Sequence, residues 1–245
     1  MRTGRPTRRT TRLVVLLAAA AVLLAGCVRS DLSVTVNEDG SGTYTAIVAI
    51  NPKALAELSK SFGGASSGEL GDDPCKEIRD GAKENQGDLP NGAKVENYSD
   101  GDFCGVKITA PFAAGDNPSE EIQSMLGGVD GGDTSGIGLD TFSIKKSGDN
   151  WIFEASPQSS SDSGSLGGTD TAFAKQFLQG AYSIVRIKLP GRVVEKDSNP
   201  DAIDGNGTLI WNINLTGETR TFKARTEPGN PITNKAYTDA CKSLP

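Results

Sequence analysis

The run Leu24-Ala25-Gly26-Cys27 constrains this chain most, because it closes an N-terminus that is first basic and then apolar. Five arginines and the apolar stretch Leu13–Leu24 follow one another in the order typical of a secretory signal peptide. The apolar stretch is too short to span a bilayer, which takes about 20 residues. One hydrophobic and two small residues before a cysteine form a lipobox, in which the cysteine sulfur accepts a diacylglyceryl group. We therefore predict that residues 1–26 are a lipoprotein signal peptide, that Cys27 is lipidated, and that the remaining chain folds outside the cytoplasm.

The charge of the mature chain limits its partners. Of the 25 basic residues, five lie in the signal peptide, which has no acidic residue. Cleavage therefore leaves 20 basic against 31 acidic side chains, a net charge near −11. A domain this acidic repels phosphate backbones, so we expect no nucleic-acid partner. Acyl chains such as palmitate on Cys27, rather than surface charge, are expected to anchor it at the extracytoplasmic face of the cell membrane.

The other cysteines fit an oxidising compartment. Once Cys27 carries lipid, Cys75, Cys104 and Cys241 remain, and an odd number leaves one without a partner. Cys75 and Cys104 close a loop of ordinary size and are the favoured disulfide, which would contribute roughly 3–4 kcal/mol by the loop-closure model. Cys241 could replace either partner or stay free, and the sequence leaves both alternatives open.

Alternating apolar residues predict that strands dominate the mature chain. Leu32, Val34 and Val36 alternate with Ser33 and Thr35, the period of a half-buried strand. Polar, glycine-rich turns connect several such stretches into hairpins. Strands are expected over residues 32–36, 43–50, 94–98, 103–109, 142–144, 151–155, 184–189, 209–215 and 222–224.

Helices are fewer. Asn51-Pro52, Asp73-Pro74 and Asn117-Pro118 each place a capping residue before a proline, which is a helix start. Helices are expected over residues 52–60, 117–126 and 171–181, and a further short helix that carries Cys75 is expected to start at Asp73-Pro74. Gly/Ser-rich loops are expected near residues 61–71, 127–138 and 158–168. The expected fold is a single α+β domain over residues 27–245, a largely antiparallel sheet with several short helices packed on it.

The sequence contains no catalytic or metal-binding motif that we recognise. It has no histidine, which removes the most common general base and every histidine-ligated metal. No nucleophile elbow, phosphate-binding loop or dinucleotide glycine pattern appears at a predicted strand–helix junction, and the chain has no C-x-x-C pair. Asp197, Asn199 and Asp201 match the first ligands of an EF-hand loop, but Ala202 replaces its glycine and Thr208 its glutamate. We expect no catalytic residues, no metal, no cofactor and no enzymatic activity.

Several segments together resemble a known family. Residues 187–195 read as a strand and a Leu-Pro-Gly turn, and residues 205–208 as a polar loop before the tryptophan-bearing strand 209–213. With the hairpin at residues 32–50 and the helical stretch 112–126, they resemble the LppM-type domain of mycobacterial and related actinobacterial envelope lipoproteins. LppM-type proteins commonly continue into a transmembrane helix. No apolar run follows here, so Cys27 is expected to be the sole anchor.

The resemblance implies a lipid-binding domain at the cell envelope, associated with glycolipids such as phosphatidylinositol mannosides. We therefore expect the domain to bind an amphiphile between its sheet and helices, without catalysis. The aromatic candidates for lining that site are Phe142, Trp151, Phe153, Phe173, Phe177 and Trp211. Each could instead pack the core, since the chain has only 14 aromatic residues.

Two other functions remain open from the sequence. One is a protein-interaction or scaffold module of the cell envelope without a ligand cavity, which would expose a large apolar patch. The other is an unrecognised hydrolase or transferase, which would need a polar cleft with carboxylates of perturbed pKa. The sequence identifies no protein partner.

Overall fold

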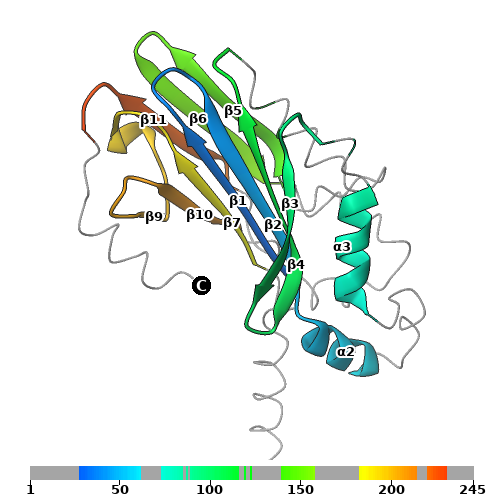
Figure 1. Cartoon of the computed structure of the whole chain (residues 1–245). Helices are drawn as coiled ribbons and strands as arrows, with labels where there is room; N and C mark the ends of the chain where they lie inside the picture. The colour runs from blue at the N-terminus through cyan, green and yellow to red at the C-terminus, as the bar shows by residue number, and fades with distance from the viewer. Residues whose placement is uncertain are drawn as a thin grey trace, which may run out of the picture.

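The computed structural model of the chain describes residues 28–61, 73–84, 87, 89–115, 119, 122, 139–157, 182–213 and 220–230. Its strands form two sheets that pack face to face (Figure 1). The large sheet contains β1 (Val28–Val36), β2 (Gly42–Ile50), β3 (Lys94–Asp100), β4 (Phe103–Phe112), β7 (Tyr182–Lys188), β9 (Ala202–Ile203) and β10 (Leu209–Ile213). The small sheet contains β5 (Leu139–Ser147), β6 (Asn150–Pro157), β8 (Arg192–Val193) and β11 (Phe222–Glu227).

The first strand of the chain lies in the middle of the large sheet, whose order is β3-β4-β2-β1-β7-β10-β9. β1 pairs with β2 in an antiparallel hairpin, closed by a turn at Gly40 with a φ of 89°. On its other side β1 pairs with β7 in parallel, with Leu32 opposite Val185. All other pairs in both sheets are antiparallel, so the largely antiparallel arrangement expected from the sequence is confirmed.

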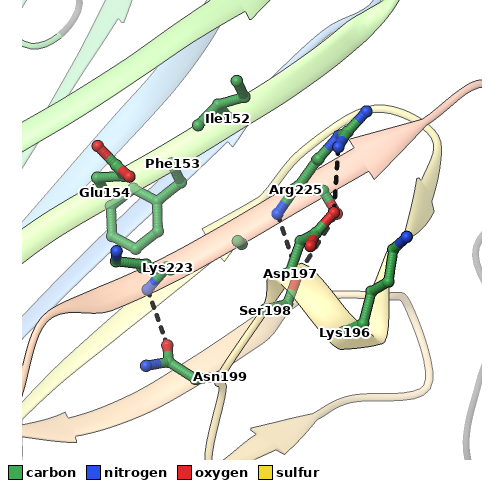
Figure 2. A pocket seen from close by; sticks show the side chains of 10 residues that line it. Ile152, Phe153, Glu154, Lys196, Asp197, Ser198, Asn199, Lys223 and Arg225 are labelled. Atoms are coloured by element: carbon green, nitrogen blue, oxygen red, sulfur yellow. Dashed lines mark hydrogen bonds and ion pairs between the residues drawn. The ribbon is translucent and has the colours of Figure 1, made fainter.

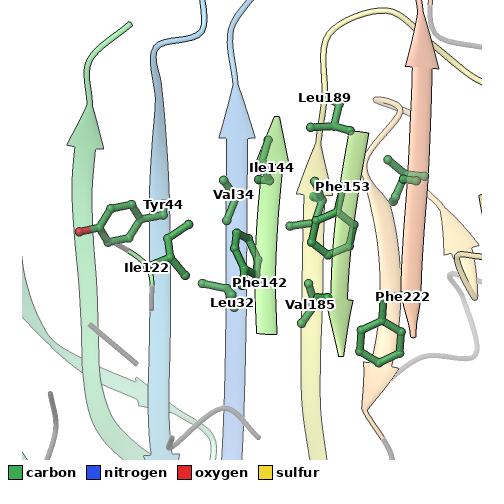
Figure 3. Packing of buried hydrophobic residues seen from close by; sticks show 14 of the residues in the cluster. Leu32, Val34, Tyr44, Ile122, Phe142, Ile144, Phe153, Val185, Leu189 and Phe222 are labelled. Carbon is green, nitrogen blue, oxygen red and sulfur yellow. The ribbon is translucent and has the colours of Figure 1, made fainter. Parts of the chain in front are cut away.

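The core lies between the two sheets, because each strand turns its alternate apolar side chains inward. Leu32 and Val34 of β1 face Phe142 and Ile144 of β5 across this layer (Figure 3). Four inward rings continue the contact along the sandwich. Phe142 and Phe153 lie 5.4 Å apart between centroids, Phe153 and Trp211 5.0 Å, and Trp211 and Phe222 6.1 Å.

Two α-helices have bounds within the described residues, α2 (Pro52–Ser61) and α3 (Pro74–Glu84). The prediction of several helices packed on the sheet therefore overstates the helical content of this part of the chain. They lie near the β3–β4 side of the large sheet (Figure 1). A disulfide joins Cys75 of α3 to Cys104 of β4, the pairing that the sequence favoured. The prediction of a single sheet covered by helices was wrong, because the small sheet covers the inner face. Alternation identifies strands but does not say which strands share a sheet.

The expected helix at residues 117–126 is described at two positions, Ser119 and Ile122, and both are helical. Ile122 is fully buried in the core, and the Ser119 hydroxyl accepts a 2.9 Å hydrogen bond from the amide of Ile144. The expected helix 171–181, the glycine-rich loops at 127–138 and 158–168, and all but the first residue of the loop at 61–71 lie outside the described residues. Within the described part of the chain, no helix is long and apolar enough to cross a membrane.

The Leu-Pro-Gly turn carries the chain from the large sheet to the small sheet, between β7 and β8. Gly191 has a φ of 92°, and a Cβ at this position would clash with the carbonyl oxygen of Glu227. The Thr226 hydroxyl donates a 2.6 Å hydrogen bond to the carbonyl of Pro190, which ties the turn to β11. Glycine is therefore required here both for the backbone angle and for the close approach of two backbone segments of the same chain.

Candidate functional site

A surface pocket of about 440 Å³ lies beside β6 and β11 of the small sheet (Figure 2). We call it the β11 pocket. Its lining residues come from β6, from β11 and from the segment that follows β8. They are Ile152, Phe153, Glu154, Lys196, Asp197, Ser198, Asn199, Lys223, Ala224 and Arg225.

The segment after β8 forms one wall of the pocket because it leaves β11 and then returns to it. The amide of Val194 donates to the carbonyl of Arg225 at 2.8 Å, and the amide of Asn199 donates to the carbonyl of Lys223 at 3.0 Å. Between these two contacts the chain bulges outward in a short 3-10 helix, η3 (Glu195–Asp197). Ser198 fixes the bulge, because its hydroxyl accepts from the amide of Arg225 at 3.0 Å and donates to the carbonyl of Val194 at 2.9 Å.

Asn199 fixes the other side of the wall. Its Oδ1 accepts hydrogen bonds from the amide of Lys223 at 2.8 Å and from Nε1 of Trp211 at 3.2 Å. Its Nδ2 donates to the carbonyl of Thr221 at 2.8 Å. Trp211 is fully buried, so these contacts connect the pocket wall to the core. The rim is therefore held by the fold before any ligand arrives.

Positive charge exceeds negative charge around the pocket, since Lys196, Lys223 and Arg225 stand against Glu154 and Asp197. Nη1 of Arg225 pairs with Asp197 at 3.1 Å, which leaves both lysines with no ion pair to another described residue. Nε of Arg225 is buried and has no hydrogen-bond acceptor in the described part of the chain.

This arrangement can bind an anionic or hydroxyl-rich group. Ammonium groups attract phosphate, and the exposed side chains of Lys196 and Lys223 bring two of them to this pocket. Among the described residues, no cluster of three or more acidic, cysteine or histidine side chains is placed to hold a metal.

Four of the six aromatic residues expected to line a ligand site are described, and all four are buried. Phe142, Phe153 and Trp211 pack against one another between the sheets, and Trp151 lies in the same core cluster with Nζ of Lys146 5.6 Å from its ring centroid. Phe153 alone also lines the β11 pocket. Phe173 and Phe177 lie outside the described residues, as do Cys27 and Cys241.

Sequence reasoning missed the polar residues of the pocket. Lys223 and Arg225 alternate with inward-facing residues of β11, a pattern that equally fits a solvent-exposed face. In the sequence, Asp197 and Asn199 match ligand positions of an EF-hand loop, but the loop lacks its glycine and glutamate, which favours a solvated turn. In the structure Asn199 instead binds the backbone of β11, and Asp197 pairs with Arg225.

Known proteins similar to this chain were found by family and by fold. The family model described as the LppM domain matches residues 29–227. The NMR structure of the folded domain of LppM from Mycobacterium tuberculosis is similar, with a TM-score of 0.48 and 16% sequence identity, covering 84% of this chain and 92% of that chain. No curated protein matches the chain.

Proposed function

The chain belongs to the LppM domain family, and from this premise we propose that it is a lipid-anchored lipoprotein of the cell envelope that binds the polar headgroup of an anionic glycolipid in the β11 pocket. Family membership supports the coarser statement, a lipoprotein-type protein associated with the envelope. The headgroup, the lipid on Cys27 and a binding rather than catalytic role are our proposal.

The observation that carries the proposal is the pair Lys196 and Lys223, two exposed cations with no described ion-pair partner at one pocket of an acidic protein. Either ammonium can approach a phosphate, while Ser198 and Asn199 offer polar groups to sugar hydroxyls. A volume of about 440 Å³ is within the range of small-ligand sites and suits a headgroup without its acyl chains.

The position of the ligand differs from the sequence-based expectation. The space between the sheets is occupied by packed rings such as Phe153 and Trp211, whose centroids lie 5.0 Å apart. Close-packed interiors leave few voids larger than a water molecule. We therefore place the headgroup on the outer side of the small sheet, with the acyl chains of the ligand remaining in the membrane.

Titration with an anionic glycolipid tests the pocket. Non-lipidated protein carrying Cys27→Ser is titrated with micelles of a phosphatidylinositol mannoside, and binding is followed by calorimetry. We expect Lys196→Ala and Lys223→Ala each to weaken binding about tenfold, which corresponds to about 1.4 kcal/mol.

The matched control is Lys188→Ala, which removes an exposed cation from β7 of the large sheet. It should leave the affinity unchanged. Equal losses in all three variants would indicate general charge attraction, and no saturable binding by the Cys27→Ser protein would contradict the headgroup proposal.

Membrane fractionation tests the anchor separately. The wild-type protein should sediment with membranes and carry the added mass of acyl chains on its first mature peptide. Two or more acyl chains give stable attachment, at about 0.8 kcal/mol per buried methylene. Cys27→Ser should move the protein to the soluble envelope fraction, whereas retention of that variant in membranes would contradict lipid anchoring at Cys27.

A further inference from the structure

One end of the large sheet is fixed next to the proposed lipid by the start of β1. Val28 is the first residue of β1 and directly follows Cys27 in the chain. Consecutive Cα atoms are about 3.8 Å apart, so no tether separates the anchor from the folded domain. A lipid on Cys27 must therefore bring this end of the sheet close to the bilayer.

Strand register shows which other segments share that end. Arg29 lies opposite Tyr182 at the start of β7, and Val28 lies opposite Ile50 at the end of β2. The turn between β3 and β4, from Asp100 to Phe103, closes at the same end. The β3–β4 turn and α2 lie together at the lower end of the molecule in Figure 1, where β1 begins.

An aromatic cluster occupies this end on the outer side of the large sheet, and we call it the anchor-side cluster. It consists of Arg29, Tyr98, Asp100, Phe103 and Tyr182. The Arg29 guanidinium carbon lies 5.5 Å from the ring centroid of Tyr98 and 5.6 Å from that of Tyr182. The rings of Tyr182 and Phe103 meet edge to face at 6.5 Å. All three rings are partly exposed, unlike the rings of the core.

Two carboxylates at this end of the sheet are paired with cations, which reduces their repulsion from lipid phosphates. Nη1 of Arg29 binds Asp100 at 2.7 Å, and Nζ of Lys53 binds Asp102 at 2.7 Å. The exposed acids at the β3–β4 turn therefore do not present uncompensated negative charge to lipid phosphates. Tyrosine rings and a neighbouring arginine are the side chains that favour the headgroup layer of a bilayer.

We infer that the anchor-side cluster is a bilayer contact, with Phe103, Tyr98 and Tyr182 in the headgroup layer, so that the large sheet stands with its β1–β2 turn pointing away from the membrane. The inference rests on the proposed lipidation of Cys27. The rings limit rotation of the domain about its anchor, because leaving the interface would return partly apolar side chains to water.

Quenching by brominated lipids tests this orientation. The mature lipoprotein is reconstituted in vesicles of phosphatidylcholine and phosphatidylglycerol whose acyl chains carry bromine near the headgroup. Phe103→Trp adds a fluorophore at the cluster, and Asp149→Trp adds one at the turn between β5 and β6. The native Trp151 and Trp211 are buried between the sheets. We expect loss of the added emission for Phe103→Trp and none for Asp149→Trp or the wild type.

Deuterium exchange tests the same orientation in the protein without an added tryptophan. Vesicle-bound lipoprotein should show added protection at residues 98–104 and 182–184, relative to the Cys27→Ser protein in solution, and none at residues 37–41. A vesicle-bound protein without quenching of Phe103→Trp and without that protection would overturn the orientation and leave the anchor intact. A protein that does not float with vesicles would overturn the anchor, and the orientation with it.

Discussion

Trp211 combines two roles in one side chain. It is fully buried, its ring packs on Phe153 and Phe222, and its Nε1 donates a 3.0 Å hydrogen bond to the carbonyl of Asn199. The ring therefore supports the core, and its one polar atom supports the wall of the β11 pocket. A buried indole with a satisfied N–H is the favourable case for tryptophan in a core.

Two substitutions separate the ring from its hydrogen bond. Trp211→Phe keeps an aromatic ring but removes the donor, so we expect a loss of about 1–3 kcal/mol in the free energy of unfolding. Trp211→Ala also leaves a cavity, and its expected loss is about 3–5 kcal/mol. Urea denaturation followed by circular dichroism measures both. Similar losses for the two variants would contradict the part assigned to the ring.

Tyr98 and Tyr182 are expected to ionise at unusually high pH. Burial raises the pKa of both phenols, and the positive charge of Arg29 opposes that rise. Because the folded-state pKa lies above the unfolded value, the neutral phenols stabilise the fold below pH about 10. That contribution disappears as the pH rises through the folded-state pKa.

An alkaline titration of phenolate absorbance checks this expectation. Tyr98→Phe and Tyr182→Phe should each remove part of the high-pH component. Arg29→Gln should move it to still higher pH, because the opposing positive charge is gone. Lys188→Gln is the control and should change nothing. A downward movement with Arg29→Gln would contradict the arrangement of the anchor-side cluster.

Among the connections between elements, the Leu-Pro-Gly turn has the strictest requirement. Gly191 combines a φ of 92° with backbone contact to Glu227, so an added methyl group meets both strain and a clash. Gly205 has no atom within 4 Å of the position that a Cβ would take. The two glycines therefore form a matched pair for substitution.

Gly191→Ala should destabilise the protein by more than about 1 kcal/mol, since both the angle and the contact are lost. Gly205→Ala should be neutral or slightly stabilising, by up to about 1 kcal/mol, through the entropy of the unfolded chain. Thermal unfolding of the two variants in parallel gives the comparison. Equal melting temperatures would show that the turn tolerates a side chain.

The disulfide holds α3, a helix with no fully buried residue, against β4. It closes a loop with a sequence separation of 29, and the loop-closure model assigns roughly 3–4 kcal/mol to such a bond. The Cα atoms are 5.7 Å apart, a usual spacing for a bridge. With so little apolar burial, α3 depends on this covalent link for its position.

Reduction should therefore lower the midpoint of urea unfolding of the wild type. The double variant Cys75→Ala/Cys104→Ala should have that lower midpoint already and should not respond to the reductant, which makes it the internal control. Amide exchange should increase in α3 and change little in β1. A reduced protein with an unchanged midpoint would contradict the stabilising role of the bond.

The sequence predicts the local elements of this fold well and their assembly poorly. The hairpins around Gly40 and Gly148 follow from alternation and turn residues, and both are confirmed. The parallel pairing of Leu32 with Val185 is not visible locally, because both flanking sequences read simply as strands. For the same reason the division into two sheets was missed. The disulfide between Cys75 and Cys104 was favoured on loop size, with Cys241 left open as an alternative partner, and the structure shows the favoured pairing.

The candidate site shows the same division. Inward aromatic residues such as Phe153 and Trp211 are easy to find in sequence, but core packing and ligand binding select the same residue type. The pocket residues Lys196 and Lys223 belong to strand and loop patterns that normally face water. Only the bulge at η3, which places Lys196 beside β11, turns them into one site.

At the scale of the whole molecule, the described residues place the two proposed interactions on different parts of the fold. The anchor-side cluster lies on the large sheet at the start of β1, whereas the β11 pocket belongs to the small sheet. Each can be altered without touching the other, so Lys196→Ala tests headgroup binding while Phe103→Trp tests orientation. An acidic domain with two such local exceptions can be held at an anionic surface without lying flat against it.

The central place of β1 has a consequence for how the protein matures. The Ser30 hydroxyl of β1 donates a hydrogen bond to the Ser183 hydroxyl of β7 across a sequence separation of 153. β1 is therefore synthesised long before the strand that it pairs with. Until β7 emerges, one edge of β1 has no partner, and an open edge is a template for wrong pairing between chains. A truncated chain that ends before residue 182 would leave this edge of β1 exposed, so the C-terminal third of the chain is needed to cover a strand at its beginning.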